Sequence, residues 1–114
     1  MIERIGNVYY RVRDMDAAVR FYTDVLGFTL KFRDGSRWAA FDVNGLTFAL
    51  EEGDPGGGGG ATVSLRVRDL DALVATLRTR GADVDDVREG AHERRADMRD
   101  PSGNHMVLYE PLAR

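Results

Sequence analysis

The sequence predicts an α+β fold made of two β-α-β-β-β modules in tandem. Two observations lead to this prediction. First, the segment at residues 11–17, Arg-Val-Arg-Asp-Met-Asp-Ala, recurs half a chain later at residues 66–72 with a single change, Met15 to Leu70. Second, each copy joins an apolar stretch to residues with helical periodicity, which is typical of one structural unit used twice. We expect the modules to span about residues 1–54 and 61–114 of a single domain covering residues 1–114.

A glycine-rich linker is expected over residues 53–60, between the two modules. It reads Gly-Asp-Pro followed by a run of glycines, and such a run would lose too much chain entropy inside a helix or a strand. The composition leaves two interpretations open. The linker is either a hinge that lets the modules pair within one chain or between two chains, or a long surface loop.

The first module begins with a strand expected over residues 5–12, where β-branched and aromatic residues are frequent. Asp14 then has the position of a helix N-cap, and apolar residues follow at helical spacing as far as Leu26. Gly27 lies where a glycine commonly ends a helix. Three further strands, separated by Asp-Gly and Asn-Gly turns, are expected over residues 28–32, 38–43 and 46–51.

The second module repeats this order. A strand is expected over residues 61–67, followed by a helix that Asp69 caps and that ends near Gly81. Its buried side would consist of Leu70, Leu73, Val74 and Leu77. Short strands are then expected over residues 82–87, 94–99 and 105–110, the last two joined by a turn at 100–104. One helix covers only one face of a sheet, so the other face of each sheet needs a partner.

Composition excludes several classes of protein. A hydrophobic fraction of 43% argues against a disordered chain, and a net charge of −3 provides no basic surface for nucleic acid. The chain has no cysteine and only two histidines, His92 and His105, which excludes disulfides and a three-histidine metal site within one chain. It has no apolar run of membrane-spanning length and no signal segment, so we expect a cytoplasmic protein without membrane contact.

Three segments resemble those of a known superfamily. They are residues 8–12 with Asp-Met-Asp-Ala-Ala at 14–18, the sequence Phe-Tyr-Thr-Asp-Val-Leu-Gly-Phe at 21–28, and Arg-Asp-Pro-Ser-Gly-Asn at 99–104 followed by an apolar strand and Glu-Pro. In combination they resemble the vicinal oxygen chelate superfamily, which includes glyoxalase I, extradiol dioxygenases, and fosfomycin and bleomycin resistance proteins. The resemblance implies the glyoxalase/bleomycin resistance fold, with open, curved mixed sheets, and a homodimer.

The resemblance also implies where a metal would be held. Enzymes of this superfamily usually bind a divalent ion through two ligands from each module, and the corresponding positions here are Asn7, Ala49, Thr62 and Val107. No side chain in this set is ionisable, and alanine and valine have no donor atom. We therefore expect no metal and no other cofactor. A different strand register leaves one alternative, a displaced metal held by Glu51 with His105.

Strand alternation predicts which side chains share the face of these positions and line a ligand site. They mix aromatic, small and polar groups, which suits an organic ligand. The predicted ligand-binding residues are Asn7, Tyr9, Arg11, Trp38, Ala49, Glu51, Thr62, Ser64, Arg66, His105, Val107 and Tyr109.

Several of these residues have a second interpretation. Trp38 could equally belong to the core. Arg11 and Arg66 could hold an anionic group of a ligand, or they could pair with Glu51 and nearby aspartates. His105 is the candidate catalytic base, oriented by Glu51 or Tyr109, or else a histidine that merely lies beside a hairpin turn.

These features favour a metal-free protein that binds a small organic molecule and sequesters an aromatic or antibiotic-like ligand, as bleomycin resistance proteins do. One alternative is a lyase, isomerase or cyclase that uses His105 or a displaced metal. Another is a structural or regulatory module without a ligand. The residues do not identify the ligand.

Overall fold

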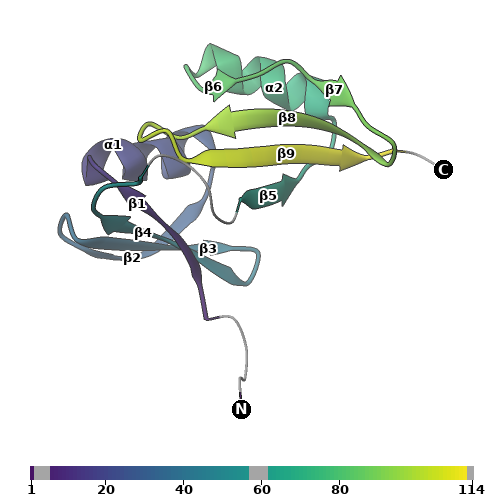
Figure 1. Cartoon of the computed structure of the whole chain (residues 1–114). Helices are drawn as coiled ribbons and strands as arrows, with labels where there is room; N and C mark the ends of the chain where they lie inside the picture. The colour runs from purple at the N-terminus through teal and green to yellow at the C-terminus, as the bar shows by residue number, and fades with distance from the viewer. Residues whose placement is uncertain (2–5, 57–61, 113–114) are drawn as a thin grey trace. The chain divides into compact units, whose positions relative to one another are not determined.

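The computed structural model describes residues 1, 6–56 and 62–112, and the chain divides into two compact units, Met1–Gly56 and Gly57–Arg114. Each unit contains one mixed sheet and one helical segment (Figure 1), which confirms the predicted α+β class. Residues 5 and 61, where two strands are expected to begin, lie outside the described residues, as do residues 57–60 of the expected linker. Among the described residues, no helix has the length and apolar character needed to cross a bilayer.

The first unit contains a four-stranded sheet with the order β1-β4-β3-β2, in which β1 and β4 are parallel and the other pairs are antiparallel. Its elements are β1 (Val8–Val12), α1 (Met15–Arg20), the π-helical segment η1 (Phe21–Val25), β2 (Thr29–Asp34), β3 (Trp38–Val43) and β4 (Leu46–Glu52). The strands predicted over residues 28–32, 38–43 and 46–51 are confirmed within two residues, and the first strand begins at Val8, later than predicted. Asp14 caps α1 as predicted, because its side chain accepts a hydrogen bond from the Ala17 backbone N–H at 3.0 Å.

The predicted helix has the expected length but not a uniform geometry. From Phe21 onward its turns widen into the π-helical segment, and Gly27 ends it with a φ of 77°. The predicted apolar stripe is buried at Met15, Ala18, Val19 and Tyr22. Tyr22 is fully buried, and its ring centroid lies 4.9 Å from that of Phe48 and 5.9 Å from that of Phe41. Aromatic rings therefore form the core between the helical segment and its sheet.

The second unit contains a sheet with the order β5-β9-β8-β6, and β7 pairs with β8 beside this path. Its elements are β5 (Val63–Arg66), α2 (Leu70–Thr79), β6 (Asp83–Val84), β7 (Arg88–Glu89), β8 (Glu93–Arg99) and β9 (His105–Pro111). Leu70, Val74 and Leu77 of the predicted helix stripe are buried, and Leu73 is half-buried. The strand expected over residues 82–87 is shorter than predicted. The strand β7 was not predicted, because two charged residues show no strand periodicity.

The start of α2 is held from two sides. The Asp69 side chain caps the helix by accepting a hydrogen bond from the Ala72 backbone N–H at 3.4 Å. The backbone N–H of Asp69 donates to Oε2 of Glu110 on β9 at 2.9 Å. Asp69 has a φ of 46°, a left-handed conformation that aspartate tolerates better than most residues. The cap predicted at Asp69 is confirmed.

A buried carboxylate organises the turn between β8 and β9. Asp100 is only 5% exposed, and its side chain accepts hydrogen bonds from the backbone N–H groups of Ser102 at 2.9 Å and Asn104 at 2.8 Å. The Asn104 side-chain amide donates to the same carboxylate at 3.0 Å. This turn, predicted at residues 100–104, sets the register of the two strands that carry most of the candidate site in this unit.

Candidate functional site

In the first unit, the predicted site residues lie on the face of the sheet opposite α1. Tyr10 and Phe48 are on the α1 side, since their rings pack together at 5.7 Å and Phe48 also contacts Tyr22. Alternation then directs their strand neighbours away from α1. The register brings Tyr9 opposite Ala49, and Arg11 and Trp38 opposite Glu51. Asn7 comes just before β1 and is exposed.

An aromatic pair is the main feature of this face. The ring centroids of Tyr9 and Trp38 are 5.4 Å apart, with the planes tilted by 57°. Tyr9 is 45% exposed and Trp38 is half-buried, while Ala49 beside them is fully buried. Trp38 therefore does not belong to the aromatic core under α1, although a place in the core was the other interpretation of this residue. The exposed part of this aromatic pair is a surface on which a flat ring can stack.

Arg11 and Glu51 form an ion pair on the same face, with Nε and Oε1 3.2 Å apart. One of the two interpretations of Arg11, a pairing with Glu51, is thus found in the structure. The contact also bears on a displaced metal at Glu51, because a cation there would have to compete with the guanidinium of Arg11.

In the second unit, the candidate residues likewise lie on the face opposite the helix. Met106 and Leu108 pair with the buried Met98 and Ala96 of β8, and we assign this apolar face to the buried side of α2, so that their strand neighbours point the other way. The register forms three rows across the sheet. Arg66, Tyr109 and Arg95 form the first row, Ser64, Val107 and Asp97 the second, and His105 and Arg99 the third. Thr62 comes just before β5 and is exposed.

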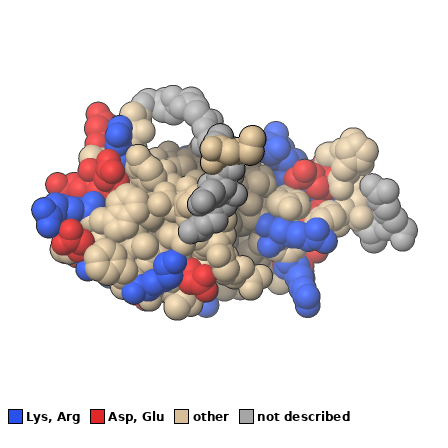
Figure 2. Space-filling view, turned by 90° about the horizontal axis from the view of Figure 1, so that it is seen from below, with Lys and Arg blue, Asp and Glu red and all other residues tan. Residues whose placement is uncertain are grey.

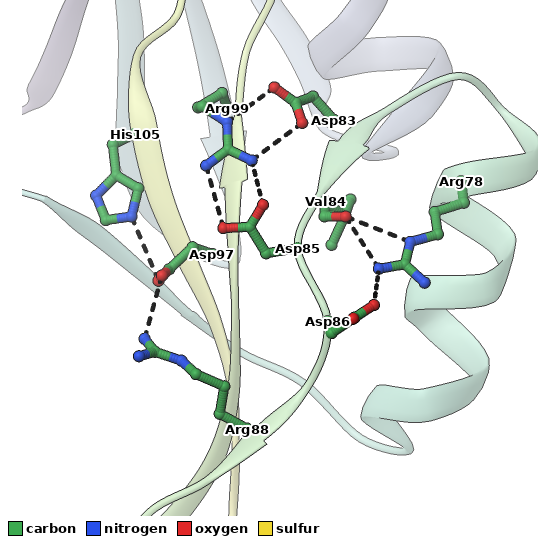
Figure 3. A network of polar contacts seen from close by, with 9 residues as sticks. All are labelled: Arg78, Asp83, Val84, Asp85, Asp86, Arg88, Asp97, Arg99 and His105. Atoms are coloured by element: carbon green, nitrogen blue, oxygen red, sulfur yellow. Dashed lines mark hydrogen bonds and ion pairs between the residues drawn. The ribbon is translucent and has the colours of Figure 1, made fainter.

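His105 has a carboxylate partner that the sequence analysis did not identify. Its Nε2 lies 3.3 Å from Oδ1 of Asp97, which was not among the partners expected, Glu51 or Tyr109. Figure 3 shows Asp97 between His105 and Arg88, whose Nη2 lies 3.1 Å from the other carboxylate oxygen. Asp97 was missed because it follows Arg-Arg-Ala in a segment that resembles a solvated strand face. The turn at Asp100 could have identified this partner. It sets the register in which Arg99 is opposite His105, and Asp97, two residues earlier on β8, is then a diagonal neighbour of His105.

Basic neighbours keep Asp97 ionised. Burial alone would raise the pKa of Asp97, but hydrogen bonds from Arg95 and His105 and the charges of Arg88 and Arg95 bring that pKa below its usual value. Arg95 contributes through Nη2, 3.1 Å from Oδ1. The carboxylate can therefore orient the histidine ring as an acceptor.

A second ion-pair group lies beside this one. Arg99 contacts Asp83 at 2.8 Å and Asp85 at 2.5 Å, which ties β8 to β6 and the residue that follows it (Figure 3). The hydrogen bond from Arg99 holds the pKa of Asp83 below its ordinary value. Arg99 is thus balanced by two carboxylates, whereas Asp97 is shared among several cations.

The positions at which enzymes of the resembled superfamily hold a metal do not fit a divalent ion here. Ala49 and Val107 are buried and have no donor atom, while Asn7 and Thr62 offer neutral oxygens only. Within residues 6–56 and 62–112, no group of three or more His, Asp or Glu side chains could hold a metal. The guanidinium groups of Arg88 and Arg95 around Asp97 would also oppose a cation beside His105.

Comparison with known proteins agrees with this architecture. The family model of the Glyoxalase/Bleomycin resistance protein/Dioxygenase superfamily matches residues 4–108. The chain belongs to this superfamily. Both the superfamily and the glyoxalase/bleomycin resistance fold expected from the sequence motifs are thereby confirmed. An uncharacterized protein of Mycolicibacterium smegmatis (strain ATCC 700084 / mc(2)155) is 38% identical over 109 residues, which are 94% of this chain and 93% of that protein.

Two solved structures of similar fold carry names of different function. TnmS3, an antibiotic binding protein from Streptomyces sp. CB03234, is 29% identical with a TM-score of 0.78, over 97% of this chain and 98% of that one. Lactoylglutathione lyase from Agrobacterium tumefaciens is 18% identical with a TM-score of 0.81, over 96% of this chain and 94% of that one. The second likeness shows the fold alone. The same fold thus occurs in a protein described as antibiotic binding and in one named as a lyase.

Proposed function

We propose that this protein is a metal-free binder of an aromatic or antibiotic-like small molecule, with its two units acting together as one glyoxalase-like domain in a cytoplasmic homodimer. The observation that carries the proposal is the Tyr9–Trp38 pair, an accessible aromatic surface on a face whose metal-ligand positions have no suitable donors. The likeness to TnmS3, which is described as an antibiotic binding protein, supports it at 29% identity.

The chemistry of this face suits stacking. A flat ligand laid against Tyr9 or Trp38 would gain roughly 0.5–1.5 kcal/mol per aromatic contact beyond the burial of its surface. Glu51 is engaged with Arg11, so the polar groups beside the rings are already paired and do not repel an uncharged ring. Binding of this kind requires no metal.

Charge supports the absence of nucleic acid and membranes from the expected partners. Acidic and basic side chains are interspersed on the surface that Figure 2 presents, without a broad field of one charge in that view. A net charge of −3 also gives no long-range attraction to polyanions.

An enzyme of the lyase, isomerase or cyclase type is the second candidate, and the contact between His105 and Asp97 favours it. A carboxylate on one ring nitrogen fixes the tautomer and leaves the other nitrogen able to take a proton from a substrate. Against this function, the side chain of His105 is 44% exposed, and Asp97 also serves Arg88 and Arg95. Such an exposed histidine lacks the dry surroundings in which a base is most effective.

One experiment separates the two functions. Metal-free protein is titrated by calorimetry with a panel of planar aromatic antibiotics, and the compound is then released by denaturation and analysed by mass spectrometry. A binding protein returns the compound unchanged in stoichiometric amount. Conversion of the compound, lost in His105→Ala and Asp97→Asn, would establish the enzyme instead. Failure of every aromatic compound to bind would contradict the proposal.

A further inference from the structure

An arginine row crosses the sheet of the second unit, on the face opposite α2. Arg66 on β5 stands opposite Tyr109 on β9, Tyr109 opposite Arg95 on β8, and Arg95 opposite Arg88 on β7. Neighbouring strands are about 4.7–4.9 Å apart, and residues opposite each other share a face. Three guanidinium groups therefore start from one row, with a tyrosine ring among them. We call Arg66, Arg88, Arg95 and Tyr109 the arginine row.

The arginines of the arginine row outnumber the carboxylates that pair with them. Among the described residues the side chain of Arg66 has no hydrogen-bond or ion-pair partner, and the side chains of Arg88 and Arg95 share the single carboxylate of Asp97 at 3.1 Å each. Two other arginines of β8 have more carboxylate partners. Arg94 binds Asp71 through two hydrogen bonds, and Arg99 binds two separate aspartates.

One donor of the row has no acceptor. The Nε atom of Arg95 is buried and makes no hydrogen bond to any residue that the structure describes. A buried N–H without an acceptor is unfavourable, and an acceptor that arrives with a ligand removes that cost. The side chains themselves stay reachable, since Arg66 is exposed and the side chain of Arg95 is 38% exposed.

We propose that the arginine row binds an oxyanion of the ligand, such as a carboxylate or a phosphonate, with Tyr109 against the adjoining part of the molecule. Planar guanidinium groups bind such oxyanions in a forked geometry that an ammonium group cannot match. The inference rests on the proposed function and narrows its ligand class from aromatic molecules in general to anionic aromatic ones.

The test uses three probes that separate charge from aromaticity: 2-naphthoate, neutral 2-naphthalenemethanol and methylphosphonate. Calorimetry and the side-chain Nε–Hε resonances of ¹⁵N-labelled arginine report binding to the full chain. The informative variant is Arg66→Gln, which removes a side chain without a partner among the described residues and should leave the fold intact. Arg20→Gln on α1 is the matched control, with the same loss of charge in the other unit.

We expect 2-naphthoate to bind more tightly than 2-naphthalenemethanol and to shift the Arg95 Nε–Hε resonance. Arg66→Gln should lower the affinity for 2-naphthoate about tenfold, as expected for a hydrogen bond between charged groups, and leave the alcohol unaffected. Arg20→Gln should change neither affinity.

The other outcomes distinguish this inference from the proposed function. Equal binding of the naphthoate and the alcohol in all three proteins would overturn the arginine row as an anion site and leave the aromatic binder standing. Binding of methylphosphonate alone, lost in Arg66→Gln, would support the row and contradict the aromatic ligand. An equal loss in Arg20→Gln would show general charge attraction and overturn the inference, as would the absence of any binding.

Discussion

Arg11 on β1 forms an ion pair with Glu51 on the neighbouring strand β4, whereas the equivalent arginine in the second unit, Arg66, stands opposite Tyr109. The two arginines occupy the same place in the repeated segment Arg-Val-Arg-Asp. One difference on the facing strand leaves the first guanidinium balanced and the second without a carboxylate among the described residues. The two units thus share the strand arrangement around this arginine but differ in whether its charge is balanced by a carboxylate.

Tyr109→Glu should give the second unit the arrangement found in the first, in which the arginine of the repeat faces a glutamate on the neighbouring strand. The new carboxylate would face Arg66 and Arg95, so binding of 2-naphthoate should be lost while the protein stays folded. Tyr109→Gln is the control, since it removes the same ring without adding charge and should keep part of the binding. Calorimetry measures the affinity and urea denaturation the free energy of unfolding. Unchanged binding in Tyr109→Glu would contradict a role for this row.

Asp97→Asn should alter the dependence of stability on acid. Because the pKa of Asp97 is lower in the folded protein than its ordinary value of 3.8, ionised Asp97 stabilises the fold above that value. This contribution is lost as pH falls through the lowered pKa. The difference in unfolding free energy between wild type and Asp97→Asn should therefore be full at pH 6 and shrink below about pH 4.

The matched control for this prediction is Asp86→Asn. The Asp86 side chain is 95% exposed, so its removal should produce almost no pH-dependent difference. Urea denaturation of the three proteins between pH 3 and pH 6 measures the effect. A difference between wild type and Asp97→Asn that does not depend on pH would show that the ion contacts of Asp97 do not stabilise the fold.

Tyr9→Ala should weaken binding of an aromatic ligand by roughly two- to tenfold, which corresponds to the loss of one stacking contact of about 0.5–1.5 kcal/mol. Trp38 is the single tryptophan, so its fluorescence reports events at this face without labelling. Leu46→Ala is the control, because Leu46 is 49% exposed and lies on the α1 side of β4. Equal affinities in Tyr9→Ala and wild type would remove Tyr9 from the site.

Metal analysis should find no stoichiometric transition metal in the purified protein, because the positions of the usual ligands lack donors. Asn7→His, Ala49→Glu, Thr62→His and Val107→Glu together should create a site for Zn²⁺ or Ni²⁺, detected as a rise in Tm with the metal. Ala49 is fully buried, so the apo variant should be less stable than wild type. Asn7→His with Thr62→His alone, at two exposed positions, is the variant to use if the fourfold change prevents folding. One tightly bound metal per wild-type chain would contradict the prediction.

Sedimentation equilibrium should show a dimer, with about twice the chain mass of 12.7 kDa. The edge strand β2 exposes Leu30 at 39% and Phe32 at 57%, and apolar groups on an unpaired edge favour association. Phe32→Glu should shift the equilibrium toward the monomer. A single species of monomer mass at micromolar concentration would contradict the expected homodimer.

Much of the fold could be predicted because local signals agree with the tertiary structure. Both aspartate caps, the buried helix stripes and the hairpin turns follow from short-range chemistry, and alternation then assigns Tyr9 and Tyr109 to the faces opposite the helices. Features that depend on contacts between strands were not foreseen. The apolar spacing of the helix does not distinguish the π-helical turns from Phe21 onward from ordinary helical turns, and the role of Asp97 follows from the register of β8 against β9. Sequence periodicity contains neither kind of information.

The hydrogen bonds around Asp100 fix the length of the turn between β8 and β9, and this length decides which side chains of β9 face the candidate site. Side chains alternate along a strand, so adding or removing one residue between β8 and β9 would exchange the two faces of the following strand. His105 and Tyr109 would turn toward α2, and Met106 and Leu108 would turn toward solvent. Variation in this hairpin is therefore restricted to changes of side chain at constant length, and loops elsewhere are the places where insertions could change ligand preference without inverting the sheet.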